Sequence, residues 1–313
     1  MNATLPIRVG TRGSPLALVQ TRTFVRLLAT VPGAGDGLVV IINTTGDAVQ
    51  DRPLADIGGK GLFAKEIHEA LLDRHIDCAV HSLKDLETEL PPNIVIGCIL
   101  KREDARDVLI PGDTCHAPNA TDPFSALPHA ALIGTSSVRR QAQLLHARPD
   151  LRVASIRGNV QTRLRKLSQG ECQASLLALA GLRRLGIEVP NAIVLDPSVM
   201  LPSAAQGIVG VTVRADDTAL RALLAMIEDP TSRTVATAER AMLATLDGSC
   251  RTPIGAWANL LADGTLTLTG MVARADGSFL LRRMLAGPAA DAARIGEDLG
   301  ASLRADSPAD LFA

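Results

Sequence analysis

The chain has 313 residues, of which 47% are hydrophobic and 21% charged, and its formal net charge is −1. This balance is ordinary for a globular protein of two or three domains, and it excludes the overall basic field that attracts nucleic acid. Aromatic residues make up only 2%, which leaves too few rings for stacking nucleic-acid bases. The first residues lack the pattern of a secretion signal, and no apolar run approaches the length of a membrane span. We therefore expect a cytoplasmic protein with no nucleic-acid or membrane partner.

Five cysteines, at positions 78, 98, 115, 172 and 250, form an odd set without a CxxC pair. That usage favours reduced thiols over a disulfide framework. The six histidines show no paired ligand spacing, so we expect no metal site. Cys250 differs from the other four because it lies in a Gly-Ser loop beside Arg251. A neighbouring cation lowers the pKa of a thiol, so Cys250 is either a nucleophile, a covalent attachment point or an ordinary exposed thiol.

The N-terminal segment reads as a strand over 7–11 that turns into a helix starting near Leu16. Ser14 is a good N-cap, and Pro15 at the first helical position loses no needed hydrogen bond. Arg12 lies in this turn beside free backbone N–H groups, where anions bind. A surface arginine with no ligand is the alternative.

A buried strand over 38–42 precedes a polar stretch, 48–59, which we interpret as a loop that could act as a lid. Lys60-Gly61-Leu62-Phe63 then leads into a helix over 64–73. The run lacks the GxxxxGK[ST] spacing, so we reject a nucleotide-triphosphate site. Lys60 remains able to bind a carboxylate.

Ser82, Lys84 and Asp85 follow the end of a buried strand, Cys78-Ala79-Val80. Open α/β sheets bind ligands outside the carboxyl ends of their strands. A carboxylate there keeps its charge beside a lysine and can face a developing cation. The alternative is a solvated Lys-Asp pair at an ordinary strand end.

Arginines gather after two later strands. The strand over 131–134 leads into Thr135-Ser136-Ser137-Val138-Arg139-Arg140, and the strand over 153–156 leads into Arg157-Gly158-Asn159 and a helix that carries Arg163. Cations in the first turn oppose the helix dipole unless an anion binds between them. Between 134 and 170 there are eight Lys or Arg and one acid, Asp150. A duplex-binding face is the alternative, but arginines that end separate strands are expected to converge on a cleft.

The order of the elements predicts an α/β fold with three domains. Residues 101–107 form a dense charge run, interpreted as a crossing between domains or a solvated linker with internal ion pairs. A strand over 208–214 appears after a crossover at 201–207 and returns to the first domain. After 229 the pattern changes to a helix, three strands near 254–261, 265–274 and 278–286, and a final helix, a small α+β unit. The predicted boundaries are 1–101 with 207–226, then 106–202, then 229–313.

Several ordered motifs resemble those of the porphobilinogen deaminases (hydroxymethylbilane synthases), and the resemblance covers nearly the whole chain. The motifs include Thr11-Arg12-Gly13-Ser14-Pro15, Gly58-Gly59-Lys60-Gly61-Leu62-Phe63, His81-Ser82-Leu83-Lys84-Asp85, Arg102-Glu103-Asp104-Ala105-Arg106-Asp107, Gly134-Thr135-Ser136-Ser137-Val138-Arg139-Arg140, Arg157-Gly158-Asn159, Gln206-Gly207 and Gly248-Ser249-Cys250.

The resemblance implies two domains like those of type II periplasmic binding proteins and a third domain whose cysteine, Cys250 here, carries a dipyrromethane cofactor by a thioether. It implies a transferase of tetrapyrrole biosynthesis, expected to be a monomer. It further implies that four porphobilinogen molecules are added to the cofactor, each losing ammonia, and that hydroxymethylbilane is released by hydrolysis.

The resemblance also implies roles for single residues. Asp85, with Lys84 and Arg12, is expected to be catalytic, because loss of ammonia leaves a cation that a carboxylate stabilises. The acetate and propionate groups of the pyrroles are expected to meet a set of donors, and Phe63 could stack on a ring. The binding set is Ser14, Lys60, Phe63, Ser82, Thr135, Ser137, Arg139, Arg140, Arg157, Gly158, Arg163, Arg184 and Gln206.

Four positions depart from the pattern of the family: Asp56, Glu87, Gln173 and Ala205. Asp56 puts a loop contact in doubt, and Ala205 could stiffen a hinge. The competing function is that of a two-domain binding protein for a small polyanion, without chemistry. Cys250 and the third domain argue against it, as does the missing export signal.

Overall fold

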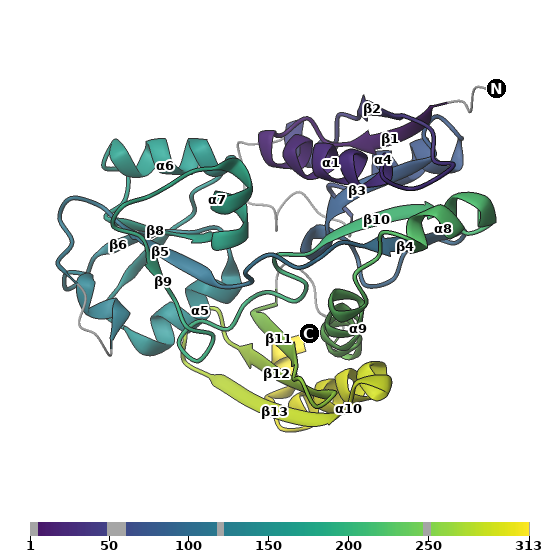
Figure 1. The fold of residues 1–313 in the computed structure, drawn as a ribbon. Coiled ribbons are helices and arrows are strands. Elements are labelled where there is room, and N and C mark those ends of the chain that lie inside the picture. Colours follow the sequence, from purple (N-terminus) through teal and green to yellow (C-terminus); the bar gives the residue numbers. More distant parts are fainter. Residues whose placement is uncertain (1–5, 49–60, 118–121, 247–251, 313) are drawn as a thin grey trace. The chain divides into compact units, whose positions relative to one another are not determined.

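The computed structural model describes residues 6–48, 61–117, 122–246 and 252–312. The chain divides into two compact units. Figure 1 shows the helices and strands that form them. Of the described residues, the first unit contains those up to Glu103 together with Gly207–Arg233, and the second contains Asp104–Gln206 together with those from Thr234 onward. The three predicted domain boundaries stay a prediction.

The first unit is built on a five-stranded sheet in the order β2-β1-β3-β10-β4. β1 is parallel to β2 and β3, whereas β10 is antiparallel to both β3 and β4. The strands are β1 (Ile7–Thr11), β2 (Gly37–Ile41), β3 (Cys78–Ser82), β4 (Ile94–Ile99) and β10 (Val209–Arg214). The strand β10 is the segment that returns to the first sheet after an excursion of about a hundred residues.

The second unit repeats this topology in a sheet of order β7-β6-β8-β5-β9. Here β6 is parallel to β7 and β8, and β5 is antiparallel to β8 and β9. The strands are β5 (Asp107–Pro111), β6 (Leu132–Gly134), β7 (Arg152–Ala154), β8 (Ala174–Ala178) and β9 (Ile193–Val194). Two sheets with one strand order confirm the predicted α/β class.

Helices cover both faces of each sheet, so both faces of the strands are apolar. In the first unit α1 and α8 pack on one face and α4 on the other; in the second unit α5 packs opposite α6 and α7. The helices are α1 (Pro15–Leu28), α2 (Thr45–Ala48), α4 (Lys65–Leu72), α5 (Val138–Ala147), α6 (Val160–Ser168), α7 (Leu179–Leu185), α8 (Thr218–Ala225), α9 (Pro230–Thr245) and α10 (Ala292–Ala305).

Cys78 and Cys98 belong to the core between these layers and are fully buried. Burial raises the pKa of the Cys98 thiol to about 12 and raises that of Cys78 as well, because a thiolate is poorly solvated there. Both side chains are therefore packing groups, as expected from their apolar strands.

The remaining part of the second unit is an antiparallel sheet of β11 (Ile254–Leu260), β12 (Thr265–Ala273) and β13 (Leu280–Pro288), and α10 packs on it. These bounds agree with the predicted strands to within two residues. The β12–β13 turn contacts α5, where Gln141 Nε2 donates to Ala275 O at 3.0 Å and His146 Nδ1 lies 2.9 Å from Gly277 O. The compact unit thus includes both the arginine-rich sheet and the small α+β part.

Two departures from the family pattern have a local structural reason. Gln173 accepts a hydrogen bond from the Leu132 backbone at 2.9 Å and so joins β6 to the start of β8. Ala205 is buried and has φ +59°, a conformation that costs an L-residue about 1 kcal/mol or more. Its backbone N–H donates to Glu239 at 2.6 Å, which fixes the strained peptide. Within the described residues, no helix combines the length and hydropathy needed to cross a bilayer.

Candidate functional site

A pocket in the first unit lies where β1 and β3 end, as the sheet topology predicts for a ligand site. Polar side chains from three segments line it. They are Arg12 and Ser14 in the β1–α1 turn, Gln20 on α1, and His81, Ser82 and Asp85 at the end of β3; Phe63 closes one side.

Arg12 is held by an acid that the sequence analysis did not select. Its guanidinium contacts Asp47 at 2.9 and 2.5 Å, and Thr44 donates to the same carboxylate at 2.8 Å. Burial pushes the pKa of Asp47 upward, but the hydrogen bond and charge of Arg12 outweigh it and lower that pKa below its ordinary value. The ring of Phe63 lies over the guanidinium, 4.0 Å from Arg12 Cζ. The pocket therefore presents a fixed cation, stacked on an aromatic ring.

Gly46 supports this stack, since a Cβ at Gly46 would lie 2.5 Å from the Phe63 ring and 2.8 Å from Leu62 O. We expect Gly46→Ala to displace Phe63 from Arg12 and to lower the free energy of unfolding by about 1–3 kcal/mol, as overpacking does. Urea unfolding measures the loss, and kcat should fall with it. An unchanged urea midpoint would contradict the close contact.

Ser82 is positioned by Gln20, whose Nε2 and Oε1 atoms lie 2.9 and 3.1 Å from the Ser82 hydroxyl. Gln20 is only 3% exposed and was missed in the sequence analysis. The signal was present, because helical spacing places Gln20 on the same face as the apolar Phe24, and a buried glutamine needs a hydrogen-bond partner.

Asp85 ends a short 3₁₀ turn, η1 (Leu83–Asp85), whose first residue is fixed in the core. Leu83 is fully buried, and its backbone N–H donates to Ile208 O at 3.0 Å. Lys84 and Asp85 are both exposed, and Asp85 reaches the pocket. The charge of Asp85 acts on Arg12, whose pKa is lowered by burial but raised more by Asp47 and Asp85. The turn thus places an accessible carboxylate at the pocket.

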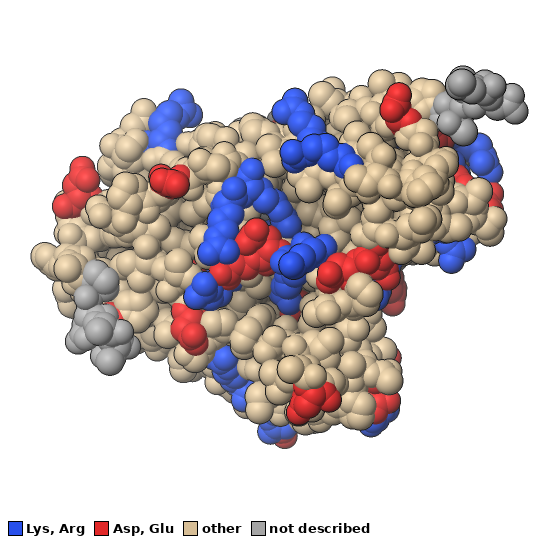
Figure 2. Space-filling view, in the orientation of Figure 1, with Lys and Arg blue, Asp and Glu red and all other residues tan. Residues whose placement is uncertain are grey.

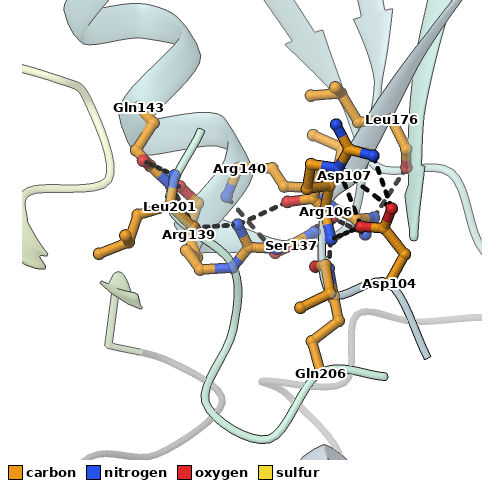
Figure 3. A network of polar contacts seen from close by, with 12 residues as sticks. Asp104, Arg106, Asp107, Ser137, Arg139, Arg140, Gln143, Leu176, Leu201 and Gln206 are labelled. Carbon is orange, nitrogen blue, oxygen red and sulfur yellow. Dashed lines mark hydrogen bonds and ion pairs between the residues drawn. The ribbon is translucent and has the colours of Figure 1, made fainter. Parts of the chain in front are cut away.

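Two arginines of the second unit, Arg139 and Arg140, contact a buried acid (Figure 3). Asp107 is 0% exposed and contacts Arg139 at 2.7 Å, Arg140 at 2.8 Å and Gln206 Nε2 at 2.8 Å. Burial alone would raise the pKa of Asp107, but the two guanidiniums outweigh it and hold the pKa far below its usual range. The interpretation of residues 101–107 as a solvated linker is wrong for Asp107, which begins β5 inside the core.

The two guanidiniums also donate to backbone carbonyls, Arg139 to Leu201 O at 2.6 Å and Arg140 to Leu176 O at 2.7 Å (Figure 3). This explains how two cations are tolerated in the first turn of α5, against the helix dipole. Two arginines share the single carboxylate of Asp107, so these three groups carry one excess positive charge. Direct binding of a ligand by Arg139 and Arg140 stays a prediction.

The other predicted residues of the second unit lie at the starts of α5 and α6 and in the turns before them, except Arg184, which lies in the last turn of α7. Thr135 is 2% exposed, and Ser137 caps α5 by accepting from the Arg140 backbone at 3.4 Å. Gly158 has φ +112°, and its carbonyl accepts from Arg163 Nε at 2.9 Å. Arg157, Arg163 and Arg184 are half-buried. Lys60 and Cys250 lie outside the described residues.

Charge over the visible face of the molecule is mixed, with acidic and basic side chains interspersed (Figure 2). This agrees with the net charge of −1 and with ion pairs such as Arg106–Asp104 at 2.6 Å. The described ranges contain no group of three or more His, Cys, Asp or Glu arranged to hold a metal.

The chain is therefore an α/β protein in which an accessible carboxylate lies beside a fixed cation in the first unit, and two buried arginines share one acid in the second. Comparison with known proteins specifies this class. The family model described as "Porphobilinogen deaminase, dipyromethane cofactor binding domain" matches residues 7–222, and "Porphobilinogen deaminase, C-terminal domain" matches residues 234–305. The chain belongs to the porphobilinogen deaminase family.

Curated relatives support this over nearly full length. The porphobilinogen deaminase of Paracoccus denitrificans is 50% identical over 309 residues, covering 98% of this chain and 96% of the relative. The chloroplastic enzyme of Pisum sativum is 46% identical, covering 96% and 82%. Among solved structures, the Bordetella pertussis BvgS periplasmic VFT2 domain has a TM-score of 0.41 at 12% identity, covering 74% of this chain and 92% of that one. The chain is thus an enzyme of tetrapyrrole biosynthesis that uses a dipyrromethane cofactor.

Proposed function

We propose that Asp85 is the group that stabilises positive charge during the addition of each porphobilinogen. Its accessible carboxylate at the pocket carries this proposal. Departure of ammonia leaves a cation on the pyrrole, and a preorganised carboxylate lowers the energy of that state without reorganising. The positive charge of Arg12 cannot fully cancel the negative charge of Asp85, because Arg12 is already paired with Asp47.

The carboxylates of the pyrrole side chains are assigned to the arginines of the second unit. Arg139 and Arg140 have one excess positive charge after pairing with Asp107, which an acetate or propionate would balance. Arg157, Arg163 and Arg184 add guanidiniums that bind carboxylates bidentately, with Lys60 as a further candidate. The neutral donors Ser14, Ser82, Thr135 and Ser137 complete the set. The residues present therefore fit a cofactor whose side chains are carboxylates.

The cofactor, when bound, supplies the nucleophilic pyrrole carbon to which substrate is joined. Every other contribution comes from the chain: arginines orient the carboxylates, and Asp85, which follows Lys84 in the turn η1, stabilises the cation. Gln206 fixes Asp107 from the crossover and so supports the arginine pair. A cytoplasmic location and a monomeric state are part of the proposal; the buried free thiols of Cys78 and Cys98 are consistent with a reducing compartment.

Attachment at Cys250 is tested by intact mass under denaturing conditions, with a peptide map. We expect the purified protein to exceed its sequence mass by one dipyrromethane, located on the peptide that contains Cys250. Cys250→Ser should have the bare mass, before and after incubation with porphobilinogen. Cys115→Ser is the matched control, because Cys115 is half-buried and its thiol donates to Gln173 O at 3.2 Å. A dipyrromethane that stays on the Cys250→Ser chain after denaturation would refute the assignment of Cys250 as the attachment residue.

A further inference from the structure

Behind the pocket, two histidines pack together between α4 and the first sheet. His81 on β3 is 7% exposed and His68 on α4 is 3% exposed. Their ring centroids are 5.9 Å apart with the planes tilted by 51°. On its other side His81 Nε2 lies 2.9 Å from the hydroxyl of Thr212, a buried contact across to β10. The His81 ring is therefore fixed from two elements, and it is also part of the pocket wall.

His81 immediately precedes the residues that carry the proposed chemistry. Ser82 ends β3 and Asp85 ends the turn that follows, so the orientation of the strand end decides where both side chains point. β3 and β10 are held in register here by pairing of His81 with Gly210 and of Ser82 with Val209. The His81–Thr212 contact adds the buried side-chain link between these strands next to the pocket.

We propose that His81 is a positioning residue for the reaction, holding the end of β3 through Thr212 so that Ser82 and Asp85 face the pocket. The inference rests on the proposed role of Asp85.

The charge state of His81 supports this role and opposes proton transfer. Burial lowers the pKa of His81 to about 3, and the neighbouring His68 and Arg12 lower it in the same direction. The ring contacts His68 from α4 and Thr212 from β10, and the charge of Arg12 in the β1–α1 turn also acts on it. The ring is thus neutral near pH 7, and the wall beside Asp85 carries no imidazolium that would offset its carboxylate.

The test compares His81→Asn, His81→Gln and Thr212→Val as holoenzymes. A glutamine amide reaches the position of Nε2, whereas asparagine is too short, and valine removes the hydroxyl with little change in shape. We expect His81→Asn and Thr212→Val each to lower kcat about 10- to 100-fold, as small misplacements of reacting groups do. The double variant His81→Asn/Thr212→Val should lose no more kcat than either single variant, because both changes remove the same contact. His81→Gln should recover most of the activity.

Three further readouts separate positioning from a structural or acid–base role. The urea midpoint should fall too little to account for the loss of kcat, and the apparent pKa values of the pH–rate profile should not move. The ring ¹⁵N shifts of His81 should change in Thr212→Val, in which the Nε2 partner is gone. His146→Ala is the matched control: it removes an imidazole contact of the same 2.9 Å length, from Nδ1 to Gly277 O in the second unit, and should leave kcat unchanged.

Each remaining outcome is decisive. Full kcat in His81→Asn and Thr212→Val would overturn the inference, and so would a loss explained by unfolding alone. A displaced pH–rate profile would assign His81 to proton transfer instead and would also overturn it. Asp85→Asn, measured in parallel, separates the two proposals: an active Asp85→Asn refutes the proposed function, whereas an inactive one beside a fully active His81→Asn refutes only the positioning role.

Discussion

Replacement of Asp85 by asparagine is expected to lower kcat by about 10²- to 10³-fold, the cost of removing one preorganised charge-stabilising group. Asparagine keeps the size of the side chain and removes its negative charge. The cation that forms when ammonia leaves would then face a neutral amide. Because Asp85 is exposed, the free energy of unfolding should change by less than about 0.5 kcal/mol. Consumption of porphobilinogen measures kcat, and urea unfolding measures stability.

Glu89→Gln is the matched control for this charge. Glu89 is exposed and lies four residues further along the same loop, and it does not line the pocket. Its loss removes the same charge from the neighbourhood and should leave kcat within about twofold, because exposed charges are screened by solvent and salt. If Asp85→Asn keeps more than half of the wild-type kcat, or if both variants lose activity alike, the role assigned to Asp85 is wrong.

Replacement of Asp107 by asparagine is expected to have the largest effect on stability. The change leaves two buried guanidiniums without their acid, and breaking such a pair costs about 3–5 kcal/mol. The excess positive charge on these groups rises from one to two, so the orientation of Arg139 and Arg140 should also be lost. Urea unfolding measures the first effect, and the cofactor content of the purified protein measures the second.

The pH dependence gives an independent check on Asp107. Its folded pKa is depressed, so its contribution to stability is fully present above the unfolded pKa of about 3.9 and is lost as the pH falls below it. The difference in free energy of unfolding between wild type and Asp107→Asn should therefore be constant from pH 5 to 7 and narrow below about pH 4. Glu171→Gln, which removes an exposed acid 3.8 Å from Lys166, should change stability by less than about 0.5 kcal/mol. A constant difference down to pH 3 would contradict the ion-pair account.

Much of the fold could be predicted because local patterns and tertiary packing agree. Ser14-Pro15 and Ser137 begin helices at the predicted positions, and Asp263-Gly264 and Asp276-Gly277 mark the turns of the C-terminal sheet. The return of β10 to the first sheet could also be predicted, because the sequence shows an apolar strand directly after a crossover segment.

The partners of the site residues could not be predicted, because they come from distant parts of the chain. Asp107 looked like one charge in a polar run, yet its position at the start of a central strand buries it beside Arg139 and Arg140. Asp47 and Gln20 belong to no sequence motif. Their role is visible only from their contacts, of Asp47 with Arg12 and of Gln20 with Ser82. His81 was read as part of the pentapeptide motif, but its contact with Thr212 joins residues 131 positions apart.

The insertion of β10 between β3 and β4 has a consequence for synthesis on the ribosome. Until residue 214 has been made, β3 and β4 have no strand between them, so the first sheet is incomplete although its other four strands are finished by residue 99. The second sheet needs nothing beyond β9, which ends at Val194. During vectorial translation the domain encoded later in the chain can therefore complete its sheet first, while the earlier one waits with two unsatisfied strand edges for its last strand.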